Sequence, residues 1–543
     1  MKIISYKNIV ALGTTLMLAT ACSVTDLTPI DALSESTAFQ TPERIELAVA
    51  GVYDGAQSGF YTGGLNAGVV RGYPFGAAHL QQGDVRGEDM VSVAAFYAVT
   101  YNSTYDATTP NNGFFWQTTY AMINRANVVI DGIRNAPTGV NLTDAVKNSY
   151  EGELRLLRAM GHFYLLANFT RPFGDNPTAA TGGIPYRDKA TVGLVGTSTG
   201  LSVDEASKQG RNTVAECYDK MLADLDFAET NLPATRAKNN ITRATKGAAI
   251  ALKTRIRLHQ NNFAQVIAEA NKLVPTTGNL VSPIGNYQLT ATPMGPFGAG
   301  NKANVESILS IENNDVDNGG QNGAAPAMYI ASTAGGRGIV GISPIIWNQP
   351  FFPANDFRKS ADMVQQDGAT SPGRGAMFSK KYADATARTD NAPIIRYAEV
   401  LLNAAEAIAR TTTGVDARAL QLLNAVRNRA VPAGAGRYTS ASFTTNQELV
   451  QAILNERRIE FLAEGMRWLD IHRLSTDAVF TTGGIPAKAS NTNVFTALYT
   501  NNPATTFVRL AAIPYANFKF IWPLPIEEIN NNPTLKTQQN PGW

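Results

Sequence analysis

The stretch NERRIEFLAEGMRWLDIHR, residues 455–473, decides the fold that we expect for this chain. Glutamates recur in it at every fourth position, as Glu456, Glu460 and Glu464. Since residues four apart lie on the same side of an α-helix, we expect one charged helix that carries these carboxylates along one face. Enzymes that cleave glycosidic bonds use a pair of carboxylates, so one hypothesis is that this face of the helix is catalytic.

Neighbouring cations favour a structural role for the same carboxylates. Arg457, Arg458 and Arg467 lie close enough in sequence to pair with the glutamates or with neighbouring helices. An adjacent guanidinium keeps a carboxyl group ionised, which is the wrong state for a general acid. We therefore predict an ion-pair network that clamps helices together, and we extend this prediction to Arg396 and Glu399.

Length and composition indicate a globular protein with long polar connections. The chain has 543 residues, of which 44% are hydrophobic and 17% charged, and its formal net charge is +2. Glycine and asparagine are plentiful, which is typical of long loops. No basic block stands out to meet a phosphate backbone, so the composition argues against a nucleic-acid partner.

The N-terminus resembles a lipoprotein export signal. Lys2 and Lys7 precede a mostly apolar run, residues 9–21, which is too short to span a bilayer comfortably. The run ends in LATAC, residues 18–22, although the leucine usual three places before the cysteine stands one place earlier. We expect a signal peptide over 1–21, a lipid anchor such as palmitate on Cys22, and a linker over 22–40. Ordinary signal-peptidase cleavage is the alternative.

The middle of the chain predicts helices separated by long loops. Thr41 and Pro42 are suited to begin the first helix. Further helices are expected over 113–134, 144–169 and 214–232. Two helix-turn-helix segments, 246–274 and 396–430, resemble tetratricopeptide hairpins, which bury their faces only against neighbours. The expected loops are 60–112, 172–210, 276–304, 312–392 and 475–521, with a short strand over 307–311.

These patterns predict a fold class: mainly α, a tetratricopeptide-like platform of helical hairpins with long loops and a few short strands. Loops of such length are uncommon in a compact domain unless they carry function. We expect residues 41–543 to form a single domain of this kind, with the ligand-binding residues in the loop insertions.

Sequence patterns for catalysis, cofactors and metals are weak. With only Cys22 and Cys217 in the chain, lipidation of the first would leave no disulfide, and we expect the second to be a small buried side chain. The GRGIVG run at 336–341 is followed at once by Ser-Pro instead of a helix, which argues against a dinucleotide site. The histidines are scattered, and Asp315 and Asp317 lack the full spacing of a calcium loop.

Several segments, in their order along the chain, resemble one known family. They are WQTTY (116–120), ELRLLRA (153–159), TRATKGAA (242–249), IRYAEVLLNAAEA (395–407), LNAVRNRA (423–430), WPLPIEEIN (522–530) and QNPG (539–542). Together with the charged stretch and the lipoprotein start, they resemble the SusD/RagB family of nutrient-uptake lipoproteins of bacterial outer membranes.

This resemblance implies a surface-exposed, lipid-anchored protein of the cell outer membrane. It would sit as a lid on a TonB-dependent SusC-like barrel and capture oligosaccharide, or alternatively peptide in the manner of RagB. The resemblance implies a binding protein without catalytic residues, cofactor or metal. Two other classes stay open: a surface glycosidase, and a subunit that only gates its barrel.

Sugars present apolar C–H faces and many hydroxyls, so we expect aromatic rings with nearby amides in the ligand site. The family's ligand residues vary in position, and the candidates are chosen from the two long loops. The alternative for each ring is that it pins a loop to the platform. The candidates are Phe96, Tyr97, Tyr101, Asn102, Tyr105, Tyr329, Trp347 and Phe351.

Overall fold

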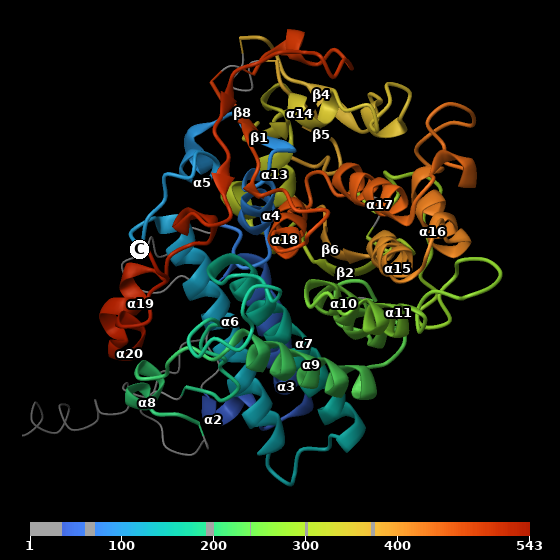
Figure 1. The fold of residues 1–543 in the computed structure, drawn as a ribbon. Helices are drawn as coiled ribbons and strands as arrows, with labels where there is room; N and C mark the ends of the chain where they lie inside the picture. The colour runs from blue at the N-terminus through green and yellow to red at the C-terminus, as the bar shows by residue number, and fades with distance from the viewer. Residues whose placement is uncertain are drawn as a thin grey trace, which may run out of the picture.

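A computed structural model describes residues 35–59, 71–191, 200–238, 240–298, 302–370, 375–492 and 494–543 (Figure 1). The predicted signal peptide, 1–21, and Cys22 lie outside the described residues. The described end of the predicted linker contains a short helix, α2 (Glu35–Ala38). Within the described ranges, no helix is both long enough and apolar enough to cross a membrane.

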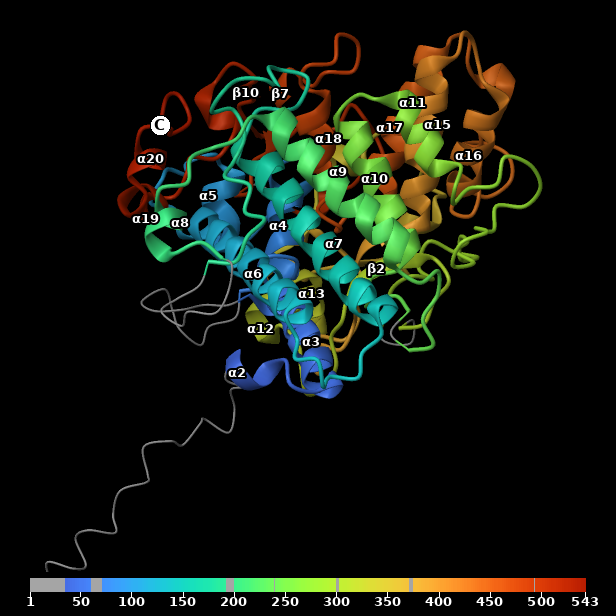
Figure 2. The same ribbon diagram turned by 90° about the horizontal axis from the view of Figure 1, so that it is seen from below.

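A row of long helices forms the platform. Each helix packs on the next in the order α3, α6, α7, α9, α10, α11, α15 and α16, and α17 packs on α15 (Figure 2). Their bounds are α3 (Pro42–Ser58), α6 (Pro110–Arg134), α7 (Asp144–Phe169), α9 (Val214–Asn231), α10 (Lys246–His259), α11 (Phe263–Ala270), α15 (Tyr397–Thr411), α16 (Ala417–Arg427) and α17 (Asn446–Glu460).

Threonine caps fix where many of these helices begin. The side-chain oxygen of each capping threonine accepts a hydrogen bond from a backbone N–H of the first turn, which would otherwise lack a partner. The caps are Thr41, Thr143, Thr213, Thr245 and Thr445. The predicted helix 144–169 is confirmed, while the one predicted from 113 begins three residues earlier, at Pro110.

The hairpins predicted from the sequence are present as α10 with α11 and α15 with α16. Helix α11 also packs on α15, so the two hairpins lie side by side, as repeat units must to bury their faces. The predicted fold class, mainly helical with long connections and a few short strands, is confirmed.

The first predicted loop is wrong over residues 77–85, which form helix α4 (Ala77–Val85) in the centre of the molecule. This helix is buried almost all round, polar side chains included. Gln81 donates to the Met328 carbonyl at 3.0 Å, and Gln82 donates to the Tyr73 hydroxyl at 3.0 Å. Because polar and apolar side chains of α4 are buried alike, its sequence has no amphipathic pattern to recognise.

A small antiparallel sheet packs against α4 through its strand β1, and its strand order is β1-β3-β5-β4. Its strands are β1 (Met90–Ser92), β3 (Val340–Ile342), β4 (Val364–Gln366) and β5 (Met377–Ser379). The β1–β3 register pairs Met90 with Ile342 and Ser92 with Val340. The chain therefore leaves β1 at the end of the sheet where it enters β3.

Shorter pieces complete the described fold. The predicted strand at 307–311 is confirmed as β2 (Ser307–Ile311), paired with β6 (Ala392–Arg396). Two further pairs join β7 (Gly484–Ile485) to β10 (Ile513–Pro514), and β8 (Lys488–Ala489) to β9 (Arg509–Leu510). The short helices are α5 (Ala98–Tyr101), α8 (Val203–Ser207), α12 (Gly320–Gly323), α13 (Ala325–Tyr329), α14 (Pro344–Trp347), α18 (Arg467–Leu474), α19 (Ile526–Asn531) and α20 (Pro533–Lys536).

The charged stretch is two helices, not the one that was predicted. Helix α17 ends at Glu460, and α18 begins at Arg467. Between them Ala463 and Gly465 have φ values of 63° and 73°, in the left-handed region that ends a helix. Glu464 consequently lies in a turn, outside the helix of Glu456 and Glu460.

Candidate functional site

All four tyrosines among the predicted ligand-binding rings are buried, namely Tyr97, Tyr101, Tyr105 and Tyr329. The Tyr101 hydroxyl donates to the Ala489 carbonyl at 2.6 Å, and the Tyr105 hydroxyl donates to the Lys519 carbonyl. The prediction of a ligand platform does not fit this burial, since none of these rings has a free face. A phenol joins an apolar ring to a polar tip, so it pins loops to the platform, as the alternative interpretation held.

The other candidates lie at opposite ends of the four-stranded sheet. Trp347, at the end of α14, is 5% exposed and packs edge-on against Phe352, with ring centroids 6.1 Å apart. Lys359 donates from Nζ to the backbone carbonyls of both residues at 2.6 Å. Phe351 beside them is half-buried. Phe351 is thus the partly exposed ring at this end of the sheet, and the guanidinium over it, that of Arg458 at 5.4 Å from the centroid, is already paired with Asp89.

Phe96 lies at the other end, four residues after the last residue of β1, and is half-buried. The Arg337 guanidinium lies 5.0 Å from its ring centroid, and that of Arg71 lies 5.7 Å from it. The edge-on ring of Tyr97 supports it from the interior, at 4.9 Å between centroids. Arg337 also donates to Asn322. We refer to Phe96, Arg71, Arg337 and Asn322 as the Phe96 surface.

Phe96 was one of the candidates chosen from the sequence, and neither arginine was among them. Arg337 is part of the glycine-rich GRGIVG run, and it reaches Phe96 because the antiparallel β1–β3 pairing sets the residues after β1 beside those before β3. Asn102, which was predicted, is exposed and follows α5 on the same segment as Phe96. The Phe96 surface thus joins a partly exposed ring to guanidinium donors, a combination suited to the C–H faces and hydroxyl oxygens of a sugar.

The predicted ion-pair network fills the interior beside α17. Glu460 accepts from Arg429 at 2.6 Å, from Arg358 at 3.0 Å and from Arg396 at 3.1 Å. Burial raises the pKa of Glu460, but Arg429, Arg396 and Arg358 outweigh burial and hold that pKa well below its usual range. Glu456 pairs with Arg358 at 2.6 Å. Glu460 therefore stays ionised, which excludes it as a general acid.

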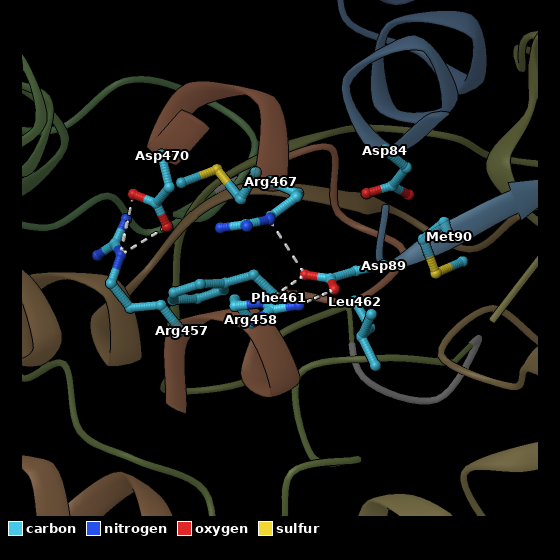
Figure 3. Close-up of a pocket in the computed structure, with 10 residues that line it drawn as sticks. Asp84, Asp89, Met90, Arg457, Arg458, Phe461, Leu462, Arg467 and Asp470 are labelled. Atoms are coloured by element: carbon cyan, nitrogen blue, oxygen red, sulfur yellow. Dashed lines mark hydrogen bonds and ion pairs between the residues drawn. The ribbon is translucent and has the colours of Figure 1, made fainter. Parts of the chain in front are cut away.

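Arg457, Arg458 and Arg467 pair with aspartates and not with the three glutamates of the charged stretch. Arg457 contacts Asp470 at 2.9 Å, while Arg458 and Arg467 contact Asp89 at 2.5 and 3.3 Å (Figure 3). The cavity among these side chains has a volume of only about 10 Å³, little more than the room one water needs. It is part of the structural network and admits no sugar.

Asp84 lines the same small cavity and has an unusual pKa. Burial raises the pKa of its carboxyl to about 8, although the Tyr329 hydroxyl and the Gly465 amide donate to it at 2.6 and 2.9 Å. A raised pKa is what a general acid needs. However, Asp84 is 1% exposed, so no glycosidic oxygen can reach its carboxyl group.

Other sequence candidates for chemistry are packed into the core. Cys217 is a buried free thiol whose pKa is raised to about 12 by burial, so it is no nucleophile. His162 and His472 are buried, as predicted, and so are Trp116 and Trp468. In the part of the chain that the structure describes, no group of three or more candidate ligands could hold a metal ion.

The chain matches known proteins over most of its length. A model of the SusD family matches residues 359–543, and a second model, described as starch-binding associating with outer membrane, matches residues 69–258. A SusD-like protein of Formosa agariphila is 23% identical over 505 residues, which cover 87% of this chain and 90% of that protein. The chain belongs to the SusD/RagB family.

Solved structures agree with this assignment. A SusD superfamily protein from Bacteroides fragilis is 25% identical, with a TM-score of 0.72 over 92% of this chain and 99% of that one. Surface glycan-binding protein A from Bacteroides thetaiotaomicron, solved in complex with laminarihexaose, is 19% identical, with a TM-score of 0.64 over 92% of this chain and 100% of that one. At that identity the second likeness concerns the fold alone.

Proposed function

We propose that this protein captures oligosaccharide at the surface of a bacterial outer membrane and delivers it to a TonB-dependent SusC-like transporter. Residues 1–21 act as the export signal, acylated Cys22 anchors the chain through the linker 22–40, and residues 41–543 form the binding domain. Each buried methylene of an acyl chain contributes about 0.8 kcal/mol to membrane binding, so a multiply acylated cysteine holds firmly.

The observation that carries the glycan proposal is the Phe96 surface. Phe96 offers a partly exposed ring, and Arg71 and Arg337 lie within 5.7 Å of its centroid. A pyranose ring can stack its C–H face on Phe96 while the guanidinium groups donate to its oxygens. Asn102 supplies an amide from the same segment. Membership of the SusD/RagB family, together with the oligosaccharide bound by surface glycan-binding protein A, supports sugar as the ligand class.

The proposed role is binding without catalysis. Glu456 and Glu460 are buried among arginines, and Asp84 is enclosed beside a cavity of about 10 Å³. A glycosidase needs two carboxylates that flank a bound substrate, one of them protonated. None of these buried carboxylates meets a space that a sugar can enter, so the transporter, and not this chain, would do the work that follows capture.

A calorimetric titration against a panel of oligosaccharides and peptides tests this function. The chain from Ser23 onward should bind selected oligosaccharides saturably, with laminarihexaose as one member of the panel, and should release no new reducing ends. Selective binding of peptides alone would replace the glycan proposal by peptide capture. Formation of reducing ends would contradict the non-catalytic role, and silence across the panel would favour a subunit that only gates its barrel.

A further inference from the structure

The Phe96 surface, where glycan capture is proposed, carries two positive charges. The guanidinium groups of Arg337 and Arg71 lie 5.0 and 5.7 Å from the centroid of the Phe96 ring, and Arg71 also lies 5.8 Å from the centroid of Phe114. A guanidinium stays protonated in proteins, so both charges are permanent. Their consequence for the choice of sugar rests on the proposed glycan capture.

The side chain of Arg337 is held in place by neutral groups. Its Nη1 donates to the Asn322 side-chain oxygen and lies 3.9 Å from the sulfur of Met328. Among the residues that the structure describes, Arg337 belongs to no ion pair. Its charge is therefore oriented by an amide, and no carboxylate of the described chain neutralises it.

The other edge of the Arg337 guanidinium faces solvent. Its Nε and Nη2 donate to no group of the described residues, and neither nitrogen is a buried atom without a partner. A nitrogen that is neither bonded nor buried is in contact with water. This edge therefore offers two parallel N–H donors to a ligand.

The same chain shows which group binds to such an edge. Arg158 donates from Nε and Nη2 to the two carboxylate oxygens of Asp224, at 2.8 and 2.6 Å. Arg255 donates in the same way to Glu399, at 2.7 and 2.6 Å. The rigid fork of an arginine matches two oxygens on one atom, as in a carboxylate or a phosphate, and such bidentate pairs are among the stronger hydrogen-bonded contacts.

Phe351 provides a comparison within the molecule, because it also lies under a guanidinium. The Arg458 guanidinium is 5.4 Å from the centroid of Phe351, but its Nε and Nη2 already donate to Asp89 at 2.9 and 2.5 Å. Of these two rings, only Phe96 has above it a guanidinium whose Nε–Nη2 edge is open.

One carboxylate does lie near the backbone beside Arg337. A Cβ atom built on Gly338 would be 3.6 Å from Oδ2 of Asp367. Asp367 is 3% exposed and accepts hydrogen bonds from the Ser332 hydroxyl at 2.8 Å and from the Thr333 amide at 3.1 Å. Its carboxylate holds the turn that precedes Arg337 and forms no ion pair with the guanidinium.

We propose that the Phe96 surface prefers anionic saccharides. A sugar ring stacks its C–H face on Phe96, and the acidic group of the sugar accepts two hydrogen bonds from Nε and Nη2 of Arg337, while Arg71 adds a second positive charge. Uronic acids and sulfate esters share the required chemistry, since each carries a negative charge and at least two oxygens on one atom. A neutral sugar stacks on the same ring without this pairing.

Calorimetric titration of the full-length chain with two matched pairs of sugars tests the preference. One pair is trigalacturonate and its methyl ester, and the other is a carrageenan tetrasaccharide and its desulfated form. In one pair or both, the charged member should bind about tenfold more tightly, or more, than its neutral partner. The pair that shows the difference identifies the anion as carboxylate or sulfate. Added salt should weaken binding of the charged member alone.

Variants of Arg337 locate the preference. Arg337→Gln should weaken binding of the charged sugar about tenfold and leave its neutral partner unchanged, and Arg337→Lys, which keeps the charge and loses the fork, should restore part of the loss. Arg509→Gln is the matched control, because Arg509 is exposed and lies 4.7 Å from the centroid of another ring, Phe507. Thermal unfolding of each variant shows whether it is folded.

The outcomes distinguish this inference from glycan capture itself. Equal affinity within both pairs, or a folded Arg337→Gln variant with unchanged affinity for the charged sugar, would overturn the anionic preference while capture of neutral glycans at Phe96 stands. Binding of hexaglutamate peptide in place of every charged sugar would overturn it as well. A folded Phe96→Ala variant that binds all sugars normally would instead contradict the proposed site, and no binding of any sugar would contradict both.

Discussion

Glu460 shows how the interior of this protein is held together at the scale of single residues. It is 1% exposed and has three guanidinium partners, Arg429, Arg358 and Arg396, that come from separate parts of the chain. Removing the negative charge takes one partner from three buried guanidinium groups at once, in a medium that solvates them poorly, although each keeps a further carboxylate partner. Glu460 is therefore a central member of the network, since its charge is shared by three arginines.

We therefore expect Glu460→Gln to lower the free energy of unfolding by about 3–5 kcal/mol, the cost of breaking a buried ion pair. Denaturant titration followed by circular dichroism measures this. Asp204→Asn is the control, because its partner Lys208 lies 2.6 Å away in an exposed pair that should contribute little. A Glu460→Gln variant as stable as the Asp204→Asn control would contradict the structural role of the network.

Asp84 makes the stability of the protein depend on pH, because burial raises its pKa to about 8 in the folded state. In the unfolded chain an aspartate titrates near ~3.9. The stability that Asp84 contributes is therefore complete below about pH 4 and is lost as the pH rises to about 8, at ~1.4 kcal/mol per pH unit.

Asp84→Asn should remove this loss, since an amide resembles the protonated carboxyl and does not titrate. Unfolding free energies measured between pH 5 and 8 should show the variant gaining on the wild type as the pH rises. A constant difference between the two proteins across this range would contradict the raised pKa.

At the scale of elements, helix α4 and the turn between α17 and α18 depend on two glycines. A Cβ atom built on Gly83 would meet the backbone of Gly465 in that turn. The turn also carries the Gly465 amide that donates to Asp84 at 2.9 Å. Any side chain at position 83 therefore pushes the central helix away from the turn.

Gly83→Ala should lower the free energy of unfolding by about 1–3 kcal/mol, the usual cost of overpacking a core. Gly139→Ala is the matched control, because nothing lies within 4 Å of a Cβ at that glycine. Chemical denaturation of both variants measures the difference. An equal effect of the two substitutions would show that the close approach of α4 to the turn does not matter.

The elements that could be predicted carry local signals. Helix α7 has a threonine cap and a long amphipathic repeat, so its bounds were predicted as 144–169. Helix α4 has neither, and its buried polar residues Gln81 and Asp84 make hydrogen bonds to residues hundreds of positions away. Strands of three residues, such as β1 and β3, are too short for an alternation of apolar and polar residues to show.

The candidate site was predictable in kind but not in detail. Phe96 and Tyr101 occur in similar sequence surroundings, yet Tyr101 is buried against a carbonyl at residue 489 while Phe96 stays partly exposed. Only the tertiary contact distinguishes them. Arg337 could not be linked to Phe96 before the β1–β3 register was known.

For the whole molecule, the four histidines of the chain predict acid sensitivity. Burial lowers the pKa of His79 to about 3 and that of His472 to about 4, and it lowers those of His162 and His259 well below the usual value. In the unfolded chain each titrates near ~6.5. Below that pH the histidines of the unfolded chain bind protons that the buried histidines of the folded protein do not bind. The free energy of unfolding therefore decreases as the pH is lowered.

Thermal unfolding at pH 7 and pH 5 should therefore show a clear loss of stability on the acid side. Each histidine lowers the free energy of unfolding by ~1.4 kcal/mol per pH unit as the pH falls from its unfolded to its folded pKa. Asp84 changes the free energy of unfolding in the opposite direction over this range and so cancels the effect of about one histidine. An unfolding free energy that is flat or rising from pH 7 to pH 5 would contradict the neutral, buried state of these side chains.

The central claim is capture of oligosaccharide at the Phe96 surface, and calorimetry on paired variants tests it most directly. The ligand is the oligosaccharide that binds best in the panel, and the variants are Phe96→Ala and Phe351→Ala, two half-buried rings at opposite ends of one sheet. We predict at least tenfold weaker binding for Phe96→Ala, which corresponds to ~1.4 kcal/mol, and unchanged binding for Phe351→Ala. Full affinity in a folded Phe96→Ala variant would contradict the account.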